Sequence, residues 1–515
     1  MTATGRRLRA ALTAAAALLG LFGLQALYAQ GQPLLAAALL GAGALVLWAY
    51  TAGRSAALRF LLPGLLAAGV FVVLPLVFTV GMGFTNYSAR NLLPLDEARA
   101  LLLAEHRQAE GSERAFHLHD TAAGLWLELE REGAAPVPLD DAATPRVLPL
   151  QPLPSPLPWP AAPPNADRAD APDAPNLRLH VRHLARLRTL TLRLPQGPAY
   201  RLATLREFAV QTPLFTADAD GSLREATTGR VFRPDASTGF FTSASGDRLQ
   251  PGFRVSVGWQ HYTRLFTDAR LSAPFAAVFG WTVLFAAGSV ALTAALGLVL
   301  AALLNWQSLE GRSVYRLVLF LPYAVPAFIS ILVFKGLFNQ NLGEINLVLH
   351  GLFGVKPAWF SDPTYARLML LLVNLWLGFP YMTVLCSGLI QSIPADLYEA
   401  SAEAGAGPWV NFSQITLPLI LKPLTPLLIA SFAFNFNNFV LISLLTGGRP
   451  DQLDAALPAG TTDLLVTYTW RIAFQDSGQQ FGLAAAVSTL IFVLVAGITL
   501  VQMRLTRQQA QEGRR

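Results

Sequence analysis

The sequence predicts an all-α, multi-pass membrane protein with a β-rich domain inserted outside the membrane. Of its 515 residues, 53% are hydrophobic and only 14% are charged, and the mean hydropathy is +0.43. A soluble protein of this length is rarely so apolar. Eight apolar stretches are each long enough for a helix that crosses a bilayer, which takes about 20 residues. Residues 85–274, between the third and fourth stretches, are numerous enough for a folded domain.

The eight predicted spans lie near residues 11–29, 33–50, 60–84, 275–304, 317–338, 368–390, 419–445 and 482–503. The first resembles a secretory signal, because arginines precede it and Ala26-Leu27-Tyr28-Ala29 ends it. Only Gln30-Gly31-Gln32 separates it from the second apolar run. That short separation favours a retained hairpin of two spans over a cleaved signal.

Arginines in the short segments predict the orientation, because cytoplasmic loops are enriched in Lys and Arg. They fall on one side of the predicted spans: Arg6, Arg7, Arg9, Arg54, Arg59, Arg312, Arg316, Arg504, Arg507, Arg514 and Arg515. Both termini and residues 391–418 are therefore expected in the cytoplasm. Residues 85–274, 339–367 and 446–481 are expected on the outer side.

The charged residues and the cysteine exclude several classes of function. The net charge of +6 suits an anionic membrane surface better than nucleic acid. Only three lysines occur, Lys335, Lys356 and Lys422, and none follows a glycine. The nucleotide-binding G-x-x-x-x-G-K-[ST] loop is therefore missing from this sequence. Cys386 lies in an apolar run, where a lone cysteine is an ordinary small core residue.

The predicted outer domain is not uniform. Residues 115–130 and 177–194 alternate apolar and polar residues, which predicts strands. Residues 145–175 are so rich in proline that we expect an extended loop or linker. The pairs His117/His119 and His180/His183 have spacings that could hold a metal. Surface histidines are the favoured interpretation, because no cysteine or carboxylate cluster accompanies them.

The cytoplasmic segment 391–418 is much longer than a simple connection between spans requires. Ala395–Ala406 is rich in helix formers and has Asp396 near its start, so a short helix is expected there. Gly405 and Gly407-Pro408 should end that helix, and Val410–Ile415 should form a second turn. The exposed small residues would let another protein approach closely.

Two predicted spans carry polar residues at helical spacing. Asn374, Gly378 and Tyr381 share one helix face, and Ser431, Asn435 and Asn438 share another, with Phe434 beside them. Amides can bond sugar hydroxyls, and aromatic rings suit the apolar faces of a pyranose. Hydrogen bonding between helices would explain the same amides, and the pattern alone leaves both readings open. Pro423 and Pro426 are expected to kink the second of these spans.

Glu399-Ala400-Ser401, Gly405 and Ile415-x-Leu417-Pro418 resemble the EAA motif of bacterial ABC-importer membrane subunits, with Ser401 in place of the usual alanine. The layout of spans resembles the larger permease subunits of maltose/maltodextrin importers. So do "VNLWLGFPYMTVLCSGL" at 373–389 and "PLTPLLIASFAFNFNNFVLISLLT" at 423–446. The proline-rich segment 145–175 is not a feature that we associate with this family.

The resemblance implies a type I ABC-importer fold in three parts. These are transmembrane helices 1–3 in residues 1–84, an extracytoplasmic domain in 85–274, and a permease core in 275–515 with the coupling loop 391–418. It implies an ATPase contact at Glu399, Ala400, Ser401, Gly405, Ile415, Leu417 and Pro418. It implies a sugar site at Asn374, Leu377, Gly378, Tyr381, Ser431, Phe434, Asn435 and Asn438.

The resemblance further implies a non-enzymatic subunit of the bacterial inner membrane, with no catalytic residue, metal ligand or cofactor of its own. A partner ATPase dimer would bind ATP and Mg²⁺. The other expected partners are a second permease subunit, an extracytoplasmic maltose-binding protein, the lipid bilayer and the sugar, which could be maltose, maltodextrin or trehalose. The alternative is a secondary transporter driven by an ion gradient. That mechanism would call for intramembrane carboxylates, and the predicted spans four to eight contain none.

Overall fold

The computed structural model describes residues 18–51, 56–109, 111–121, 124–129, 137–139, 147–149, 177–193, 199–306, 309–453, 455, 457–476 and 478–512. The contacts between residues divide the chain into two compact units. One comprises Met1–Thr85 and Val257–Arg515, and the other comprises Asn86–Ser256. Most of the proline-rich segment 145–175, and the start of the first predicted span, lie outside the described residues.

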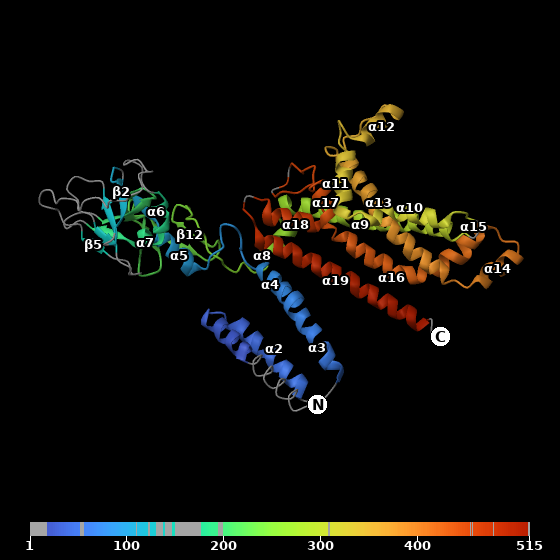
Figure 1. Cartoon of the computed structure of the whole chain (residues 1–515), viewed down its shortest axis with the longest axis horizontal. Coiled ribbons are helices and arrows are strands. Elements are labelled where there is room, and N and C mark those ends of the chain that lie inside the picture. The colour runs from blue at the N-terminus through green and yellow to red at the C-terminus, as the bar shows by residue number, and fades with distance from the viewer. Residues whose placement is uncertain are drawn as a thin grey trace. The chain divides into compact units, whose positions relative to one another are not determined.

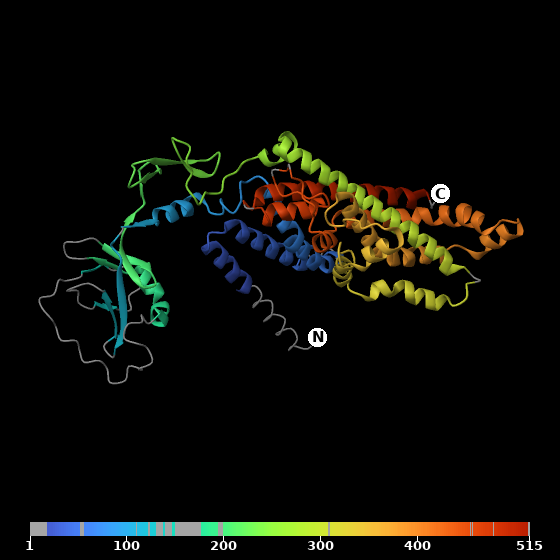
Figure 2. The same ribbon diagram turned by 90° about the horizontal axis from the view of Figure 1, so that it is seen from above.

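The first unit is helical (Figure 1). Besides a helix over Leu18–Ala29, its helices are α2 (Pro33–Thr51), α3 (Ala56–Ala68), η1 (Gly69–Val73, π-helical), α4 (Leu74–Met82), α8 (Gln260–Thr267), α9 (Ala269–Asn305), α10 (Arg312–Ala324), α11 (Ala327–Leu337), α12 (Glu344–Phe353), α13 (Pro363–Gln391), α14 (Ala395–Glu403), α15 (Pro408–Val410), η2 (Asn411–Thr416, π-helical), α16 (Leu417–Phe436), α17 (Phe439–Leu445), α18 (Leu465–Phe474) and α19 (Phe481–Glu512). Helix α9 packs along α13 and against α16, and α16 also packs against α19 (Figure 2).

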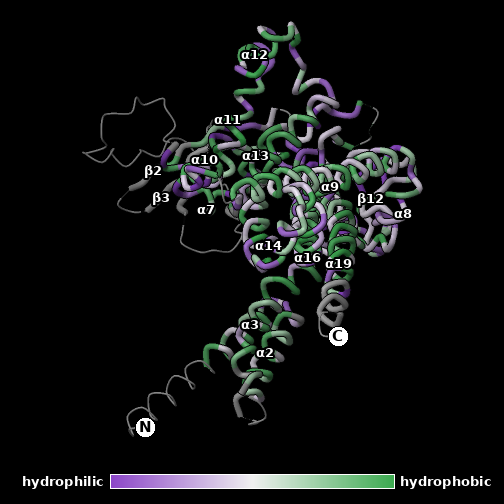
Figure 3. The backbone as a smooth tube through the Cα atoms, turned by 90° about the vertical axis from the view of Figure 1, so that its right-hand side faces the viewer, coloured by the Kyte–Doolittle hydropathy of each residue, from purple (hydrophilic) through white to green (hydrophobic). Residues whose placement is uncertain are grey.

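Long apolar helices dominate this unit, as the hydrophobic colouring in Figure 3 shows. Within the described residues, five helical stretches are long and apolar enough to cross a membrane: Phe60–Met82, Ala269–Asn305, Pro363–Gln391, Pro408–Phe436 and Phe481–Arg504. They overlap five of the eight predicted spans. The first two predicted spans overlap shorter apolar helices over Leu18–Ala29 and Leu35–Val46, so the count of eight stays a prediction.

The fifth predicted span, 317–338, is not a straight helix. Helices α10 and α11 meet at a bend of 90°. Pro326 lies at this break, where it precedes the first residue of α11. A proline disfavours helical backbone in the residue before it, and Val325 is accordingly extended, with φ −99° and ψ 127°. If the bent pair is counted as one span, the described residues contain six such stretches.

The seventh predicted span, 419–445, is also interrupted. Helix α16 continues through Pro423 and Pro426 and ends at Phe436, and α17 begins at Phe439. The Asn438 side chain accepts a hydrogen bond from the Leu441 backbone N–H, which caps the new helix. The break therefore comes at the asparagines, beyond the two prolines that predicted a kink.

The second unit is rich in strands. Its described elements are α5 (Leu95–Leu103), α6 (Leu177–Arg182), α7 (Leu184–Thr189) and strands β1 (His106–Gln108), β2 (Arg114–Thr121), β3 (Gly124–Leu129), β4 (Val137–Leu139), β5 (Val147–Pro149), β6 (Thr191–Arg193), β7 (Ala199–Thr204), β8 (Glu207–Pro213), β9 (Phe215–Ala217), β10 (Leu223–Glu225), β11 (Val231–Asp235) and β12 (Phe240–Ser243). One sheet has the order β4-β3-β2-β8-β7-β6-β5, with β1 also paired to β8, and a smaller sheet has the order β12-β11-β10-β9.

The strands predicted within 115–130 are confirmed as the hairpin β2–β3, in which Phe116 pairs with Leu129. The strand prediction for 177–194 is wrong except at β6, because α6 and α7 occupy 177–189. Leu187 and Leu190 are buried, and His183 and Leu184 are partly buried. Leu184 and Leu187 lie three residues apart on one face of α7. The alternation of leucines with polar residues concealed this helical spacing in the sequence.

Candidate functional site

Three asparagines from the two predicted polar stripes form one hydrogen-bonded chain. The Asn438 side-chain amide donates to Asn374 Oδ1 (3.2 Å), and the Asn374 amide donates to Asn435 Oδ1 (2.9 Å). The Asn435 amide in turn donates to the backbone carbonyl of Ser431 (2.9 Å). Asn374 and Asn435 are only 6% and 8% exposed. The structure thus contains the interhelical bonds that were one reading of the sequence, and sugar binding stays a prediction.

The break between α16 and α17 places these amides. Asn435 lies in the last turn of α16 and Asn438 caps α17, while Asn374 projects from the continuous helix α13. Asn437, by contrast, donates to the carbonyl of Ala433 on its own helix (3.2 Å) and takes no part in the chain. Irregular backbone beside polar groups is typical of transport sites, where helices are interrupted to expose them.

Helix α9 packs closely against the same region. A Cβ placed on Gly378 would lie 2.8 Å from the Thr293 side chain, and a Cβ on Gly297 would lie 2.5 Å from Met382. The space beside Gly378 is therefore occupied by the Thr293 side chain, whereas the sequence pattern suggested that this space could hold a sugar ring. The hydroxyl-bearing residues of α9 were not considered from the sequence, although Ser289 and Thr293 stand at i and i+4 in an apolar span.

The remaining predicted sugar-site residues surround the asparagine chain less closely. Phe434 is 73% exposed and Tyr381 is 42% exposed. Leu377 is partly buried against the apolar cluster of α9, α13 and α17. Ser431 contributes its backbone carbonyl. The structure brings together three amides and one carbonyl, and it leaves two aromatic rings open at the surface of this unit.

The second candidate site is the segment 395–418. The predicted short helix is present as α14, and it ends before Gly405, whose φ of +79° is a left-handed backbone conformation that favours glycine. A second helical segment follows as α15 and η2. Ser401 Oγ donates to Asn411 Oδ1 (2.5 Å), and the Tyr398 hydroxyl bonds the Thr416 hydroxyl (2.9 Å). The two helical segments are therefore bound to each other by side chains.

The outer surface of this segment is accessible. Glu399, Ala400 and Gly405 are exposed, and Trp409 is 75% exposed while its ring stacks on Phe412. Ile415 and Leu417 are partly buried, and Pro418 is exposed at the start of α16. Of the motif residues, Ser401 holds the loop together, and Glu399 and Ala400 face outward.

A buried polar cluster lies beyond α17. Arg471 of α18 donates to Asp463 Oδ2 (2.8 Å) and to Asp451 Oδ1 (2.5 Å). Asp463 is fully buried, and this burial raises the pKa of its carboxyl against the attraction of Arg471. The Thr446 and Thr462 hydroxyls bond each other at 2.9 Å. These bonds tie the segment after α17 to α18.

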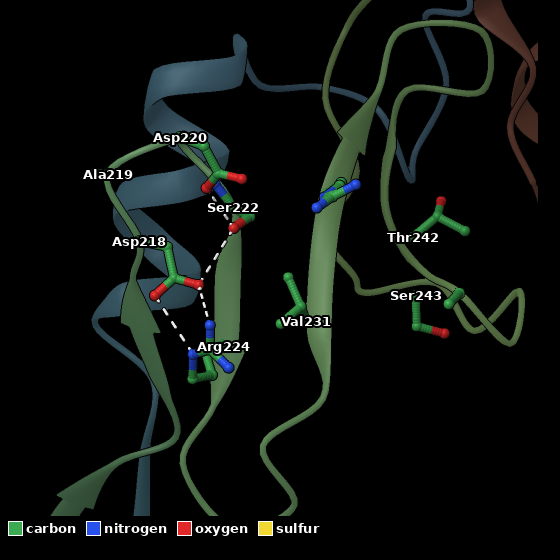
Figure 4. Close-up of a pocket in the computed structure, with 10 residues that line it drawn as sticks. Asp218, Ala219, Asp220, Ser222, Arg224, Val231, Thr242 and Ser243 are labelled. Atoms are coloured by element: carbon green, nitrogen blue, oxygen red, sulfur yellow. Dashed lines mark hydrogen bonds and ion pairs between the residues drawn. The ribbon is translucent and has the colours of Figure 1, made fainter.

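The strand-rich unit has a pocket lined by residues of β10, β11 and β12 (Figure 4). Within it, Arg224 donates to Asp218 (2.8 Å) and the Ser222 hydroxyl donates to Asp220 (2.6 Å). The hydrogen bonds from Ser222 lower the pKa of Asp220. Two acidic side chains of this pocket are thus already bound by its own residues.

Among the described residues, which leave out the side chains of one of the two histidine pairs, no three His, Cys, Asp or Glu side chains are grouped to hold a metal. His180 is buried, bonds the Leu205 carbonyl through Nδ1 (2.7 Å), and stacks on Phe116. The side chains of His117 and His119 lie outside the described residues.

Two family models match the chain. Residues 93–258 match the P2 domain of the maltose transport system permease protein MalF. Residues 293–507 match the inner membrane component of binding-protein-dependent transport systems. The second match contains both candidate sites.

Several curated relatives are similar over most of their length. The maltose/maltodextrin transport system permease protein MalF of Escherichia coli K12 is 48% identical over 493 residues, which is 94% of this chain and 93% of that protein. The protein of the same name in Photorhabdus laumondii is 45% identical over 498 residues, which is 93% of each chain. A solved chain of a bacterial alginate ABC transporter is 22% identical and has a TM-score of 0.42, over 49% of this chain and 83% of that one.

Proposed function

This chain belongs to the MalF family of maltose/maltodextrin permeases, and we propose from this premise that it forms part of the pathway for maltose or maltodextrin in an ATP-driven importer. It carries no catalytic function, and ATP hydrolysis belongs to a partner subunit. The observation that best supports the sugar pathway is the asparagine chain Asn438–Asn374–Asn435 at the break between α16 and α17.

The chemistry of this chain suits a sugar. Each amide offers both a donor and an acceptor, as a sugar hydroxyl does, so a hydroxyl can replace an amide partner without leaving either side unpaired. The exposed rings of Tyr381 and Phe434 supply apolar faces for a pyranose. With Leu377, Gly378 and Ser431, these residues form the proposed sugar site.

The segment 395–418 is proposed as the coupling loop. Glu399 would pair with a basic residue of an ATPase subunit, and Ala400 and Gly405 would allow close approach. Because Ser401 and Tyr398 join α14 to η2, the loop can move as one body. Closure of the ATPases around ATP would then shift the attached helices between inward-facing and outward-facing states.

The proposed assembly contains a MalG-like second permease subunit, a MalK-like ATPase dimer that binds ATP and Mg²⁺, and an extracytoplasmic maltose-binding protein. The protein is a multi-pass protein of the inner membrane. We propose that both termini and the coupling loop face the cytoplasm, and that the strand-rich unit faces outward and contacts the binding protein. Residues 1–84, 85–274 and 275–515 are its proposed functional divisions.

The test is ATP hydrolysis by the full chain, purified with its co-expressed partners in lipid. Each assay contains the cognate binding protein with maltose, maltotriose, trehalose, glucose or no sugar. We expect stimulation only by a binding protein loaded with maltose or maltotriose. Hydrolysis by an assembled complex that is indifferent to binding protein and to every sugar would contradict the proposal.

A further inference from the structure

Ser289 of α9 carries a buried hydroxyl that differs from those of the two threonines of its helix. The side chain is fully buried, and its Oγ has no hydrogen-bond partner among the described residues. Thr282 and Thr293 of the same helix each donate to a backbone carbonyl four residues earlier, both at 2.7 Å. A buried hydroxyl without a partner is costly, so its presence requires an explanation.

The register between α9 and α13 places Ser289 at the level of Asn374. Gly288 faces Leu371, Thr293 faces Gly378, and Gly297 faces Met382. The residue numbers increase together, so the two helices run in the same direction. On α9, Ser289 lies about one helical turn before Thr293. On α13, Asn374 lies about one helical turn before Gly378, which faces Thr293. The two polar residues therefore occupy corresponding positions on facing helices.

Ser289 also lies beside residues of α9 that share an apolar cluster with each of the helices carrying Asn374 and Asn435. Phe285, one turn earlier, belongs to the apolar cluster that contains Leu370 and Val373 of α13. Ala286, three residues before Ser289, belongs to the cluster that contains Phe436 of α16. Ser289, four residues after Phe285 and three after Ala286, therefore lies on the buried part of α9, and α9 packs against both α13 and α16.

Asn374 is the central member of the asparagine chain, with one amide bond to Asn435 and one from Asn438. A sugar bound to these amides must displace at least one of those contacts. The Asn374 amide then needs another group to keep its orientation. We propose that Ser289 is a positioning residue of the sugar site, whose hydroxyl holds the Asn374 amide when sugar hydroxyls replace its asparagine partners. This inference rests on the proposed function.

A purely structural role for Ser289 makes a different prediction. Small residues let membrane helices approach closely, and alanine serves that purpose as well as serine. Removing an unpartnered buried hydroxyl should then leave the protein unchanged or slightly more stable. Ser289→Ala therefore distinguishes the two roles. If Ser289 serves only for helix packing, the substitution leaves sugar binding unchanged, and if it positions Asn374, the substitution weakens sugar binding.

The experiment measures retention of radiolabelled maltose by the full complex in lipid, trapped with ATP and vanadate in the presence of binding protein. The quantity is the half-saturating maltose concentration for retention. Ser289→Ala is compared with Thr293→Val, which removes a hydroxyl one turn away that already bonds its own helix and keeps the methyl group against Gly378. Asn435→Ala tests the site itself. Assembly and maximal ATPase rate are measured for each variant.

We expect Ser289→Ala to raise the half-saturating concentration about fivefold, as for loss of one neutral hydrogen bond, with assembly and ATPase rate unchanged. Thr293→Val should stay within about twofold of the parent protein. Equal shifts of the half-saturating concentration in Ser289→Ala and Thr293→Val would overturn this inference alone. So would an unchanged half-saturating concentration in Ser289→Ala, provided that Asn435→Ala retains no maltose. Parental retention by Asn435→Ala would overturn the proposed sugar site and the inference with it.

Discussion

The asparagine chain and the coupling loop are built in opposite ways. In the asparagine chain, polar side chains from separate helices bond one another, with Asn374 and Asn435 buried and Asn438 partly buried. In the loop, the internal bonds of Ser401 and Tyr398 join its two helical segments, and Glu399 stays exposed. A ligand reaches the first region only by exchanging hydrogen bonds, whereas a partner can add contacts to the second without breaking any.

This difference has a physical consequence. Exchange of hydrogen bonds changes the free energy little in total, so a buried polar site can bind and release a small polar molecule repeatedly. An exposed surface held rigid by its own bonds loses little conformational entropy when a partner binds. The first arrangement suits transient sugar passage, and the second suits a lasting subunit contact.

The largest expected effect comes from breaking the asparagine chain. Asn435→Ala removes the acceptor of the Asn374 amide and a sugar partner at once, and we expect maltose uptake to fall by about a hundredfold or more while the complex still assembles. Uptake of labelled maltose into vesicles measures this. Asn437→Ala is the matched control, because that amide bonds its own helix. Equal uptake by the two variants would contradict the role of the chain.

The next effect tests the exposed surface of the loop. Glu399→Lys reverses an exposed charge, and we expect binding of the ATPase subunit to weaken by about tenfold or more, because like charges across an interface repel. Co-purification of the ATPase and sugar-dependent ATP hydrolysis are the measurements. Glu403→Lys makes the same change one helical turn further along α14 and should have the smaller effect. Normal co-purification together with normal uptake for Glu399→Lys would count against docking at this position.

A smaller effect is expected from the turn of the loop. At Gly405, φ is +79° and a Cβ would meet no atom within 4 Å, so Gly405→Ala acts only through backbone strain, at a cost of about 1–2 kcal/mol. We expect a lower coupling ratio, which is the amount of maltose taken up per ATP hydrolysed. Gly407→Ala is the control, because its φ is −80° and its surroundings are also open. Equal coupling ratios in both variants would show that coupling does not depend on glycine at the turn.

The smallest effect concerns the bond inside the loop. Ser401→Ala removes the contact to Asn411 and should lower the free energy of local opening by about 1 kcal/mol. Amide hydrogen exchange of residues 400–412 should quicken about fivefold. Ser413→Ala removes a hydroxyl that bonds only its own helix and should quicken exchange less. Unchanged exchange in Ser401→Ala would mean that the two segments are joined by other contacts.

The sequence predicted the long apolar helices, the helix at 395 and the turn at Gly405, because each depends on local properties: hydropathy over about 20 residues, helix propensity, and the backbone freedom of glycine. The polar face of α13 and the pair Ser431 and Asn435 of α16 were visible for the same reason, since side-chain periodicity follows from helix geometry. The prediction that Asn438 continues the face of Ser431 and Asn435 is wrong, because α16 ends at Phe436 and Asn438 caps α17. The helices at 177–189 were not predicted, because the leucine spacing of such short segments fits both the two-residue period of a strand and the 3.6-residue period of a helix.

What only the tertiary structure decided is which polar groups meet. The asparagine chain requires α13 to lie beside the break between α16 and α17, and that break is set by Asn438 capping a new helix. The burial of Ser289 at the level of Asn374 requires the close packing of α9 through Gly297 and against Gly378. Such contacts join residues more than 60 positions apart. No local pattern specifies them, because they depend on how separate helices fill space against one another.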